Sequence, residues 1–127
     1  MRATESPSWL ELTAEQVDAA GAVPGAAART RAELFTRLAE TLDLPGYFGR
    51  NWDALADCLS DLVETGPVTL TVEDADQLLV DEPPAQLATL LDVFDDAWSH
   101  GRHPVRVVLR TAPERLPELR RRVTAHG

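Results

Sequence analysis

The stretch LPGYFGRNWDALADCLSDLVET, residues 44–65, holds a tight turn followed by most of one helix. Proline and glycine among its first six residues are typical of a turn that ends the preceding element. Asn51 then occupies the position of a helix N-cap, whose side chain accepts a hydrogen bond from the backbone. Beyond it, apolar residues recur at helical spacing as far as about Val63. The stretch therefore predicts an amphipathic helix that begins directly after a turn.

One side of this predicted helix carries three aspartates. Because an α-helix turns by about 100° per residue, Asp53, Asp57 and Asp61 form one stripe, with Ser60 beside it. Aspartate is a weak helix former, and like charges four residues apart repel each other. Only Asp53 lies close enough to the N-terminus to gain from the helix dipole. The stripe thus favours a surface that meets a positively charged partner, although a merely solvated helix face is the alternative.

The residues on the N-terminal side of this stretch predict a strand and a further helix. Thr30 and Glu33 match a capping box, and the apolar residues after them keep helical spacing to Leu42. The alternating run 9–12 predicts a first strand. Residues 19–28 are mostly small, with two glycines and a proline, which indicates a loop.

The residues on the C-terminal side continue the alternation of strands and helices. Residues 68–72 and 105–109 are rich in β-branched side chains and predict buried strands, with a short helix or turn over 73–80. A third long helix follows Pro83–Pro84 and ends at Gly101. Its apolar face holds Leu87, Leu90, Leu91, Phe94 and Trp98. This alternation predicts an α/β fold with a parallel sheet on which the helices pack.

Charge is distributed unevenly along the 127 residues, which are enough for a single domain. The chain has 21 acidic residues against 12 arginines and no lysine, a formal charge of −9. Residues 1–109 hold 19 acidic residues and seven arginines, whereas residues 110–127 hold two acidic residues and five arginines. We expect one domain over 1–127, with its core at about 8–110 and a basic C-terminal tail over 111–127. Because the region before this tail is strongly acidic, it repels the phosphate backbone of nucleic acid. It would instead attract a basic protein surface.

The sequence also indicates a cytoplasmic protein. Residues 1–9 contain no apolar segment of the kind found in signal peptides, and no run of 18 apolar residues predicts a membrane-spanning helix. The single cysteine, Cys58, excludes an internal disulfide and is interpreted as a packing residue.

Residues 44–59 resemble the signature of the barstar-like ribonuclease inhibitors. The matching kernel is an aromatic pair and glycine, then asparagine, then Asp-Ala-Leu and Asp-Cys-Leu. The predicted elements over about 9–110 agree with this family more weakly. The resemblance implies a three-layer α/β/α fold with a small, about three-stranded parallel sheet. It also implies that the chain is not an enzyme, and that it inhibits a small secreted guanyl-specific ribonuclease inside the cell that produces the enzyme.

The resemblance assigns roles to individual residues. In this family the helix after the aromatic-glycine turn enters the phosphate-binding cleft of the enzyme, where acidic side chains stand in for RNA phosphate. By position, Asp57 would be the main anchor, Asp53 its neighbour, and Tyr47 would stack near the catalytic histidine of the enzyme. Ser60 stands where the family often has threonine. Asp96 would match an acidic residue of the later helix that meets an arginine of the enzyme.

Three positions depart from the family pattern. Ala56 and Leu62 stand where barstar has tryptophans, and Asp61 replaces a small residue. The target is therefore expected to differ from barnase or to be bound less tightly. We expect a monomer that forms a 1:1 complex with a basic ribonuclease, without a cofactor or metal. The predicted partner-binding residues are Tyr47, Asn51, Asp53, Ala56, Asp57, Ser60, Asp61 and Asp96.

Two alternatives stay open at this point. An immunity protein against another class of toxin nuclease would share the fold and the acidic face. A metal-dependent enzyme would need six potential ligands to meet between two helices: Asp53, Asp57, Asp95, Asp96, His100 and His103. Against that enzyme, no known metal-ligand spacing is present, and the carboxylates lie opposite the faces that should pack.

Overall fold

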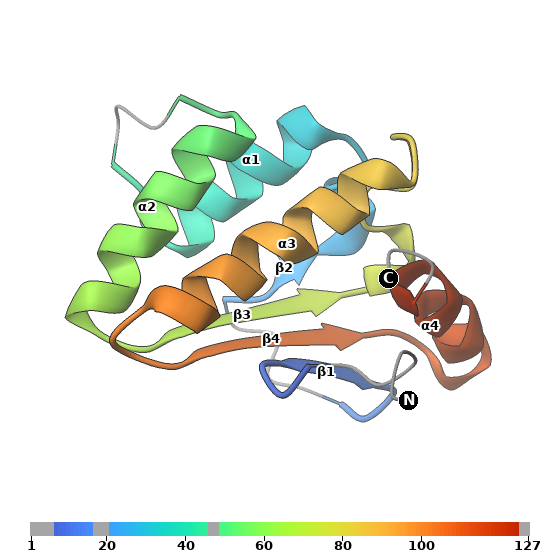
Figure 1. Ribbon diagram of the computed structural model, residues 1–127. Coiled ribbons are helices and arrows are strands. Elements are labelled where there is room, and N and C mark those ends of the chain that lie inside the picture. The colour runs from blue at the N-terminus through green and yellow to red at the C-terminus, as the bar shows by residue number, and fades with distance from the viewer. Residues whose placement is uncertain (1–6, 17–20, 46–48, 125–127) are drawn as a thin grey trace.

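A parallel sheet of four strands forms the base of the molecule, in the order β1–β4–β3–β2 (Figure 1). The computed structural model describes residues 7–16, 21–45 and 49–124. The strands are β1 (Leu10–Thr13), β2 (Val23–Pro24), β3 (Val68–Glu73) and β4 (Val105–Arg110). The helices are α1 (Arg31–Thr41), α2 (Trp52–Thr65), α3 (Ala85–His100) and α4 (Leu116–Thr124), with 3₁₀ turns η1 (Gly25–Ala27), η2 (Ala75–Gln77) and η3 (Pro113–Arg115). None of the described helices is long and apolar enough to cross a membrane.

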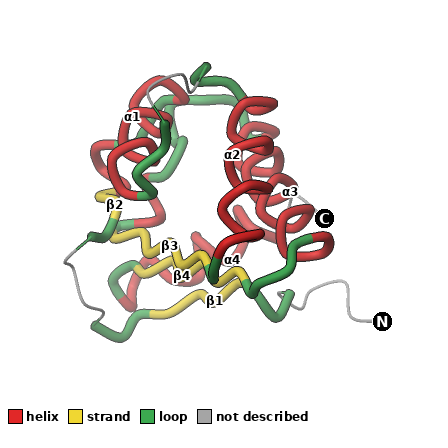
Figure 2. Tube along the Cα trace, turned by 90° about the vertical axis from the view of Figure 1, so that its left-hand side faces the viewer, coloured by secondary structure: helices red, strands yellow, loops and turns green. Residues whose placement is uncertain are grey.

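The helices occupy one face of the sheet. Figures 1 and 2 show α1, α2 and α3 on the same side, with α4 beyond the carboxyl ends of the strands. The prediction of an α/β fold with a parallel sheet is confirmed. Among the described residues the three long helices share one face of the sheet (Figure 2), and the sheet has four strands where about three were expected.

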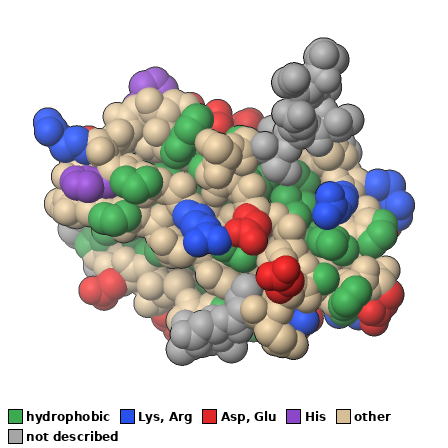
Figure 3. All heavy atoms as spheres, turned by 90° about the horizontal axis from the view of Figure 1, so that it is seen from below, with side chains coloured by type: hydrophobic (Ala, Val, Ile, Leu, Met, Phe, Trp, Pro, Cys, Tyr) green, Lys and Arg blue, Asp and Glu red, His purple; other side chains and the backbone are tan. Residues whose placement is uncertain are grey.

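The second face of the sheet carries mostly polar side chains. In β3, Val68, Leu70 and Val72 are buried toward the helices, while Thr69 between them is exposed. On the same outer face, Arg106 of β4 forms an ion pair with Glu11 of β1. Figure 3 looks onto this face, where charged side chains of both signs lie among uncharged ones. Val108 of β4 is an exception on this face, because its apolar side chain is only 6% exposed.

The additional strand, β2, comes from the small-residue stretch that was predicted to be a loop. Val23 is fully buried and pairs with Val72 of β3. Gly25 follows, and a Cβ atom at this position would lie 2.2 Å from the carbonyl oxygen of Asp74. Only glycine therefore lets η1 approach the backbone after β3 this closely.

The helix starts match the predictions. The Thr30 side chain accepts a hydrogen bond from the Glu33 amide, and the Glu33 side chain completes the capping box. At the start of α2, the Ala54 amide donates to Oδ1 of Asn51 over 2.7 Å. Trp98 is a correction: it was placed on the apolar face of α3, but its side chain is 41% exposed.

The core extends past residue 110, where the sequence predicts a basic tail that either forms a short helix or frays. Leu119 and Val123 of α4 are buried in the main apolar cluster. Thr111 is also buried, and its hydroxyl donates to Oδ1 of Asp76 over 2.6 Å. Arg115 forms an ion pair with the same carboxylate at 3.0 Å. Because these contacts join η3 and α4 to η2, the C-terminal segment belongs to the packed domain.

Candidate partner-binding surface

The outer side of α2 is acidic. The helix buries Leu55, Cys58, Leu59 and Val63. This packing leaves Asp53, Asp57 and Asp61 exposed on the opposite side. The Asn51 cap fixes where the helix begins, and therefore which residues face outward.

The three aspartates have no partner within the described part of the chain. No ion pair or hydrogen bond joins the Asp53, Asp57 or Asp61 carboxylate to another described residue. The nearby arginines are engaged elsewhere: Arg102 pairs with Glu64 at 3.1 Å, and Arg50 donates to the Thr36 hydroxyl at 2.8 Å. The stripe therefore presents uncompensated negative charge to solvent.

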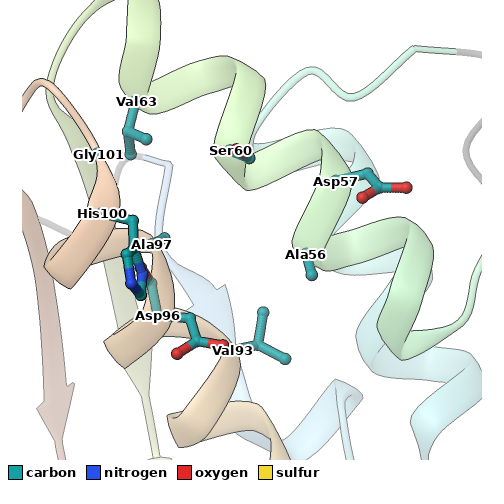
Figure 4. Close-up of a pocket in the computed structure, with 9 residues that line it drawn as sticks. All are labelled: Ala56, Asp57, Ser60, Val63, Val93, Asp96, Ala97, His100 and Gly101. Carbon is teal, nitrogen blue, oxygen red and sulfur yellow. The ribbon is translucent and has the colours of Figure 1, made fainter.

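A shallow groove of about 230 Å³ separates α2 from α3 (Figure 4). Its lining consists of Ala56, Asp57, Ser60 and Val63 from α2, with Val93, Asp96, Ala97, His100 and Gly101 from α3 and its end. In Figure 4 the Ala56 methyl points toward α3, whereas the Asp57 carboxylate points away from α3 at the α2 edge. Two acidic residues far apart in the sequence, Asp57 and Asp96, thus border the same hollow.

Two small residues shape this groove. One leaves space between α2 and α3, and the other allows the end of α3 to approach α2. Ala56 stands where a tryptophan was expected from the resemblance, and its methyl leaves the hollow unfilled. Gly101 ends α3 against α2, because a Cβ atom there would lie 2.4 Å from Cγ2 of Val63. Leu62, at the other tryptophan position, is only partly exposed and packs against the core.

Some of the residues predicted to bind a partner or a metal already form hydrogen bonds within the protein. Asn51 uses Oδ1 in the helix cap, so it positions α2. Asp95 accepts a hydrogen bond from the indole of Trp9 at 2.8 Å, which sets it apart from its neighbour Asp96. Tyr47 lies outside the described residues. The sequence indicates a role for His100 only as a potential metal ligand. No pattern in the sequence predicts that the end of its helix borders α2 at this groove.

Cys58 lies under the acidic stripe on the buried side of α2. Burial raises the pKa of its thiol, and the carboxylates of Asp61 and Asp57 add to the rise. The thiol is therefore held in its protonated, unreactive form, as expected for a packing residue.

The described residues contain no group of three or more histidine, cysteine, aspartate or glutamate side chains arranged to hold a metal ion. The metal-dependent alternative thus finds no support in this part of the chain.

Fold and surface together define a small α/β protein that exposes an acidic helical face beside a shallow groove. The model of the Barstar (barnase inhibitor) family matches residues 21–110, and the chain belongs to this family. Its members are inhibitors and not enzymes, and their partner is a ribonuclease. Membership therefore confirms the predicted family and the prediction that the chain is not an enzyme. A search among curated proteins finds no significant match.

Proposed function

We propose that the chain inhibits a small secreted guanyl-specific ribonuclease by inserting the exposed face of α2 into the phosphate-binding cleft of the enzyme. The observation that carries this proposal is the row Asp53, Asp57 and Asp61, exposed and without a described partner on a capped helix. In this proposal the inhibitor acts in the cytoplasm of the cell that makes the enzyme, as a monomer in a 1:1 complex.

The chemistry of such a cleft supports the proposal. An enzyme that cleaves RNA holds phosphate groups with arginine, lysine and histidine, which form strong charge-assisted hydrogen bonds with carboxylates. A rigid carboxylate row loses little conformational freedom on binding and attracts a basic cleft from a distance. Asp57 is in the middle of the row, so we assign it the role of main anchor, with Asp53 and Asp61 on either side.

The groove extends this surface to α3. Asp96 is exposed at its α3 edge and is assigned to a second cationic group of the enzyme. Ser60 and Ala56 lie between the two acidic edges. Asn51 completes the proposed surface as the residue that fixes the start of α2. Tyr47, which lies outside the described residues, is assigned an aromatic contact from the resemblance alone.

A toxin nuclease of another class is the second candidate target. The groove beside Ala56 supports a target other than barnase, because it leaves space for a partner side chain where barstar itself has a tryptophan. In that case the chain would be an immunity protein with the same acidic surface.

Titration of the purified protein into barnase and a panel of small secreted ribonucleases, with RNA cleavage as readout, tests the proposal. We expect stoichiometric inhibition of at least one guanyl-specific enzyme, and its loss in Asp57→Ala. Inhibition of only another class of nuclease would support the second candidate. Failure to inhibit any nuclease of the panel would refute both.

A further inference from the structure

His100 is part of the groove that Asp57 and Asp96 border. It is exposed at the end of α3, and its Nδ1 lies 3.0 Å from the backbone oxygen of Asp96. Because a carbonyl oxygen only accepts, Nδ1 carries the hydrogen of this bond. The neutral ring therefore keeps Nε2 as an acceptor, and the protonated ring has a donor and a positive charge there.

The charged groups around His100 come from α2, α3 and the loop after α3. Asp57 of α2 and Asp96 of α3 line the groove with it. Glu64, also from α2, is already paired with Arg102 of the loop at 3.1 Å. Protonation of His100 would therefore offset one of the two negative charges that border the groove.

His103 is the histidine of the loop that follows α3. Its Nδ1 lies 2.8 Å from the backbone oxygen of Val63, and its side chain does not line the groove. His103 therefore supplies a matched control, because it is a histidine close to α2 that takes no part in the proposed contact.

The lining of the groove suits an arginine side chain. Ala56 and Val93 are partly exposed in its lining and offer apolar surface to an aliphatic stem. At the edge, a carboxylate and a neutral imidazole offer acceptors to a guanidinium, which has five N–H donors in a planar arrangement. Both halves of an arginine side chain thus find complementary groups.

We propose that His100 is a specificity-determining residue of the inhibitory surface: the neutral ring accepts a hydrogen bond from a guanidinium of the ribonuclease, and the protonated ring repels it. This inference rests on the proposed function and adds a regulation of the same site. Protonation of the ring therefore loosens the complex.

The dissociation constants of the wild-type protein, His100→Gln, His100→Arg and His103→Gln test this at pH 7.5 and 5.5 and constant ionic strength. Barnase is the first probe, followed by whichever ribonuclease of the panel binds most tightly. Histidines of the enzyme titrate as well, and the ratio of wild type to His100→Gln cancels their effect. We expect the ratio of the wild-type dissociation constant to that of His100→Gln to rise about threefold on acidification. This is the effect of two like charges roughly 6 Å apart in water.

His100→Arg imitates the protonated ring, so it should bind weakly at both pH values, and the wild type should approach it at pH 5.5. His103→Gln should follow the pH profile of the wild type. A ratio that stays flat, or tight binding by His100→Arg at pH 7.5, would overturn the role of His100 while leaving the proposed function intact. If no ribonuclease is bound at either pH, both are refuted. If the melting temperatures of the His100 variants fall in parallel with their affinities, the role of His100 is also overturned, because the loss of affinity is then a consequence of unfolding.

Discussion

Asp57→Ala is expected to weaken binding to the ribonuclease without lowering the stability of the free protein. In the proposed complex the carboxylate is desolvated between cationic groups of the enzyme. Removing one partner of such a pair costs about 2–5 kcal/mol, a range for which barnase–barstar is itself a reference case. This corresponds to a dissociation constant raised about 30-fold to several thousand-fold.

The same substitution should leave the free protein slightly more stable. Asp57 is exposed and has no described partner, so no native contact is lost. Alanine is the better helix former, and two repulsions at four-residue spacing, with Asp53 and Asp61, disappear. Together these effects amount to about 0.5–1 kcal/mol, which is a rise of a few degrees in melting temperature for a domain of this size.

The assay pairs inhibition titrations with thermal unfolding, and Glu40→Ala is the matched control. Glu40 is exposed on α1 and pairs only with Arg37 at 3.0 Å, a surface contact worth little. An Asp57→Ala protein that inhibits as well as Glu40→Ala would refute the anchor role. A melting temperature lowered by more than about 5 °C would show that Asp57 has a structural role instead.

Three further outcomes are expected. Stopped-flow association with the ribonuclease should slow by about tenfold or more between 50 and 500 mM salt, since screening shortens the reach of the acidic face; a rate independent of salt would exclude steering. Leu119→Ala should lower the free energy of unfolding in urea by about 2–4 kcal/mol, because the side chain is 1% exposed; a change below about 0.5 kcal/mol would mean that α4 contributes little to the core. Hydrogen bonds from Arg29 hold the pKa of Asp81 below its ordinary value, so this pair stabilises the fold above about pH 4 and loses that effect as the pH falls through the folded value. Asp81→Asn should therefore weaken the acid dependence of unfolding, and an identical pH profile would contradict the pairing.

Helix starts and the acidic stripe were predictable because they depend on neighbours within one or two turns. The Thr30 capping box and the Asn51 cap join residues three apart, so their hydrogen bonds are available to the local chain alone. The family resemblance followed from the same short segment, and the family match over residues 21–110 agrees with it.

Long-range packing explains the differences. The burial of Leu119 depends on a core built from distant strands and helices, and no local pattern distinguishes it from a frayed basic tail. Trp98 has the spacing of a core residue, but the described neighbours leave it 41% exposed. Val23 forms a strand only because β3 offers it an open edge.

The amino-acid order by itself determined that Asp53, Asp57 and Asp61 share one side of a helix, because helical rotation is a property of the local backbone. Only the tertiary structure decided that Asp96 and His100 lie across a groove from Ser60. That juxtaposition requires two amphipathic helices to bury their apolar faces against the same sheet, with Gly101 allowing the end of α3 to approach Val63. The charge of the surface is thus encoded locally, whereas its shape arises from packing between segments that are distant in the sequence.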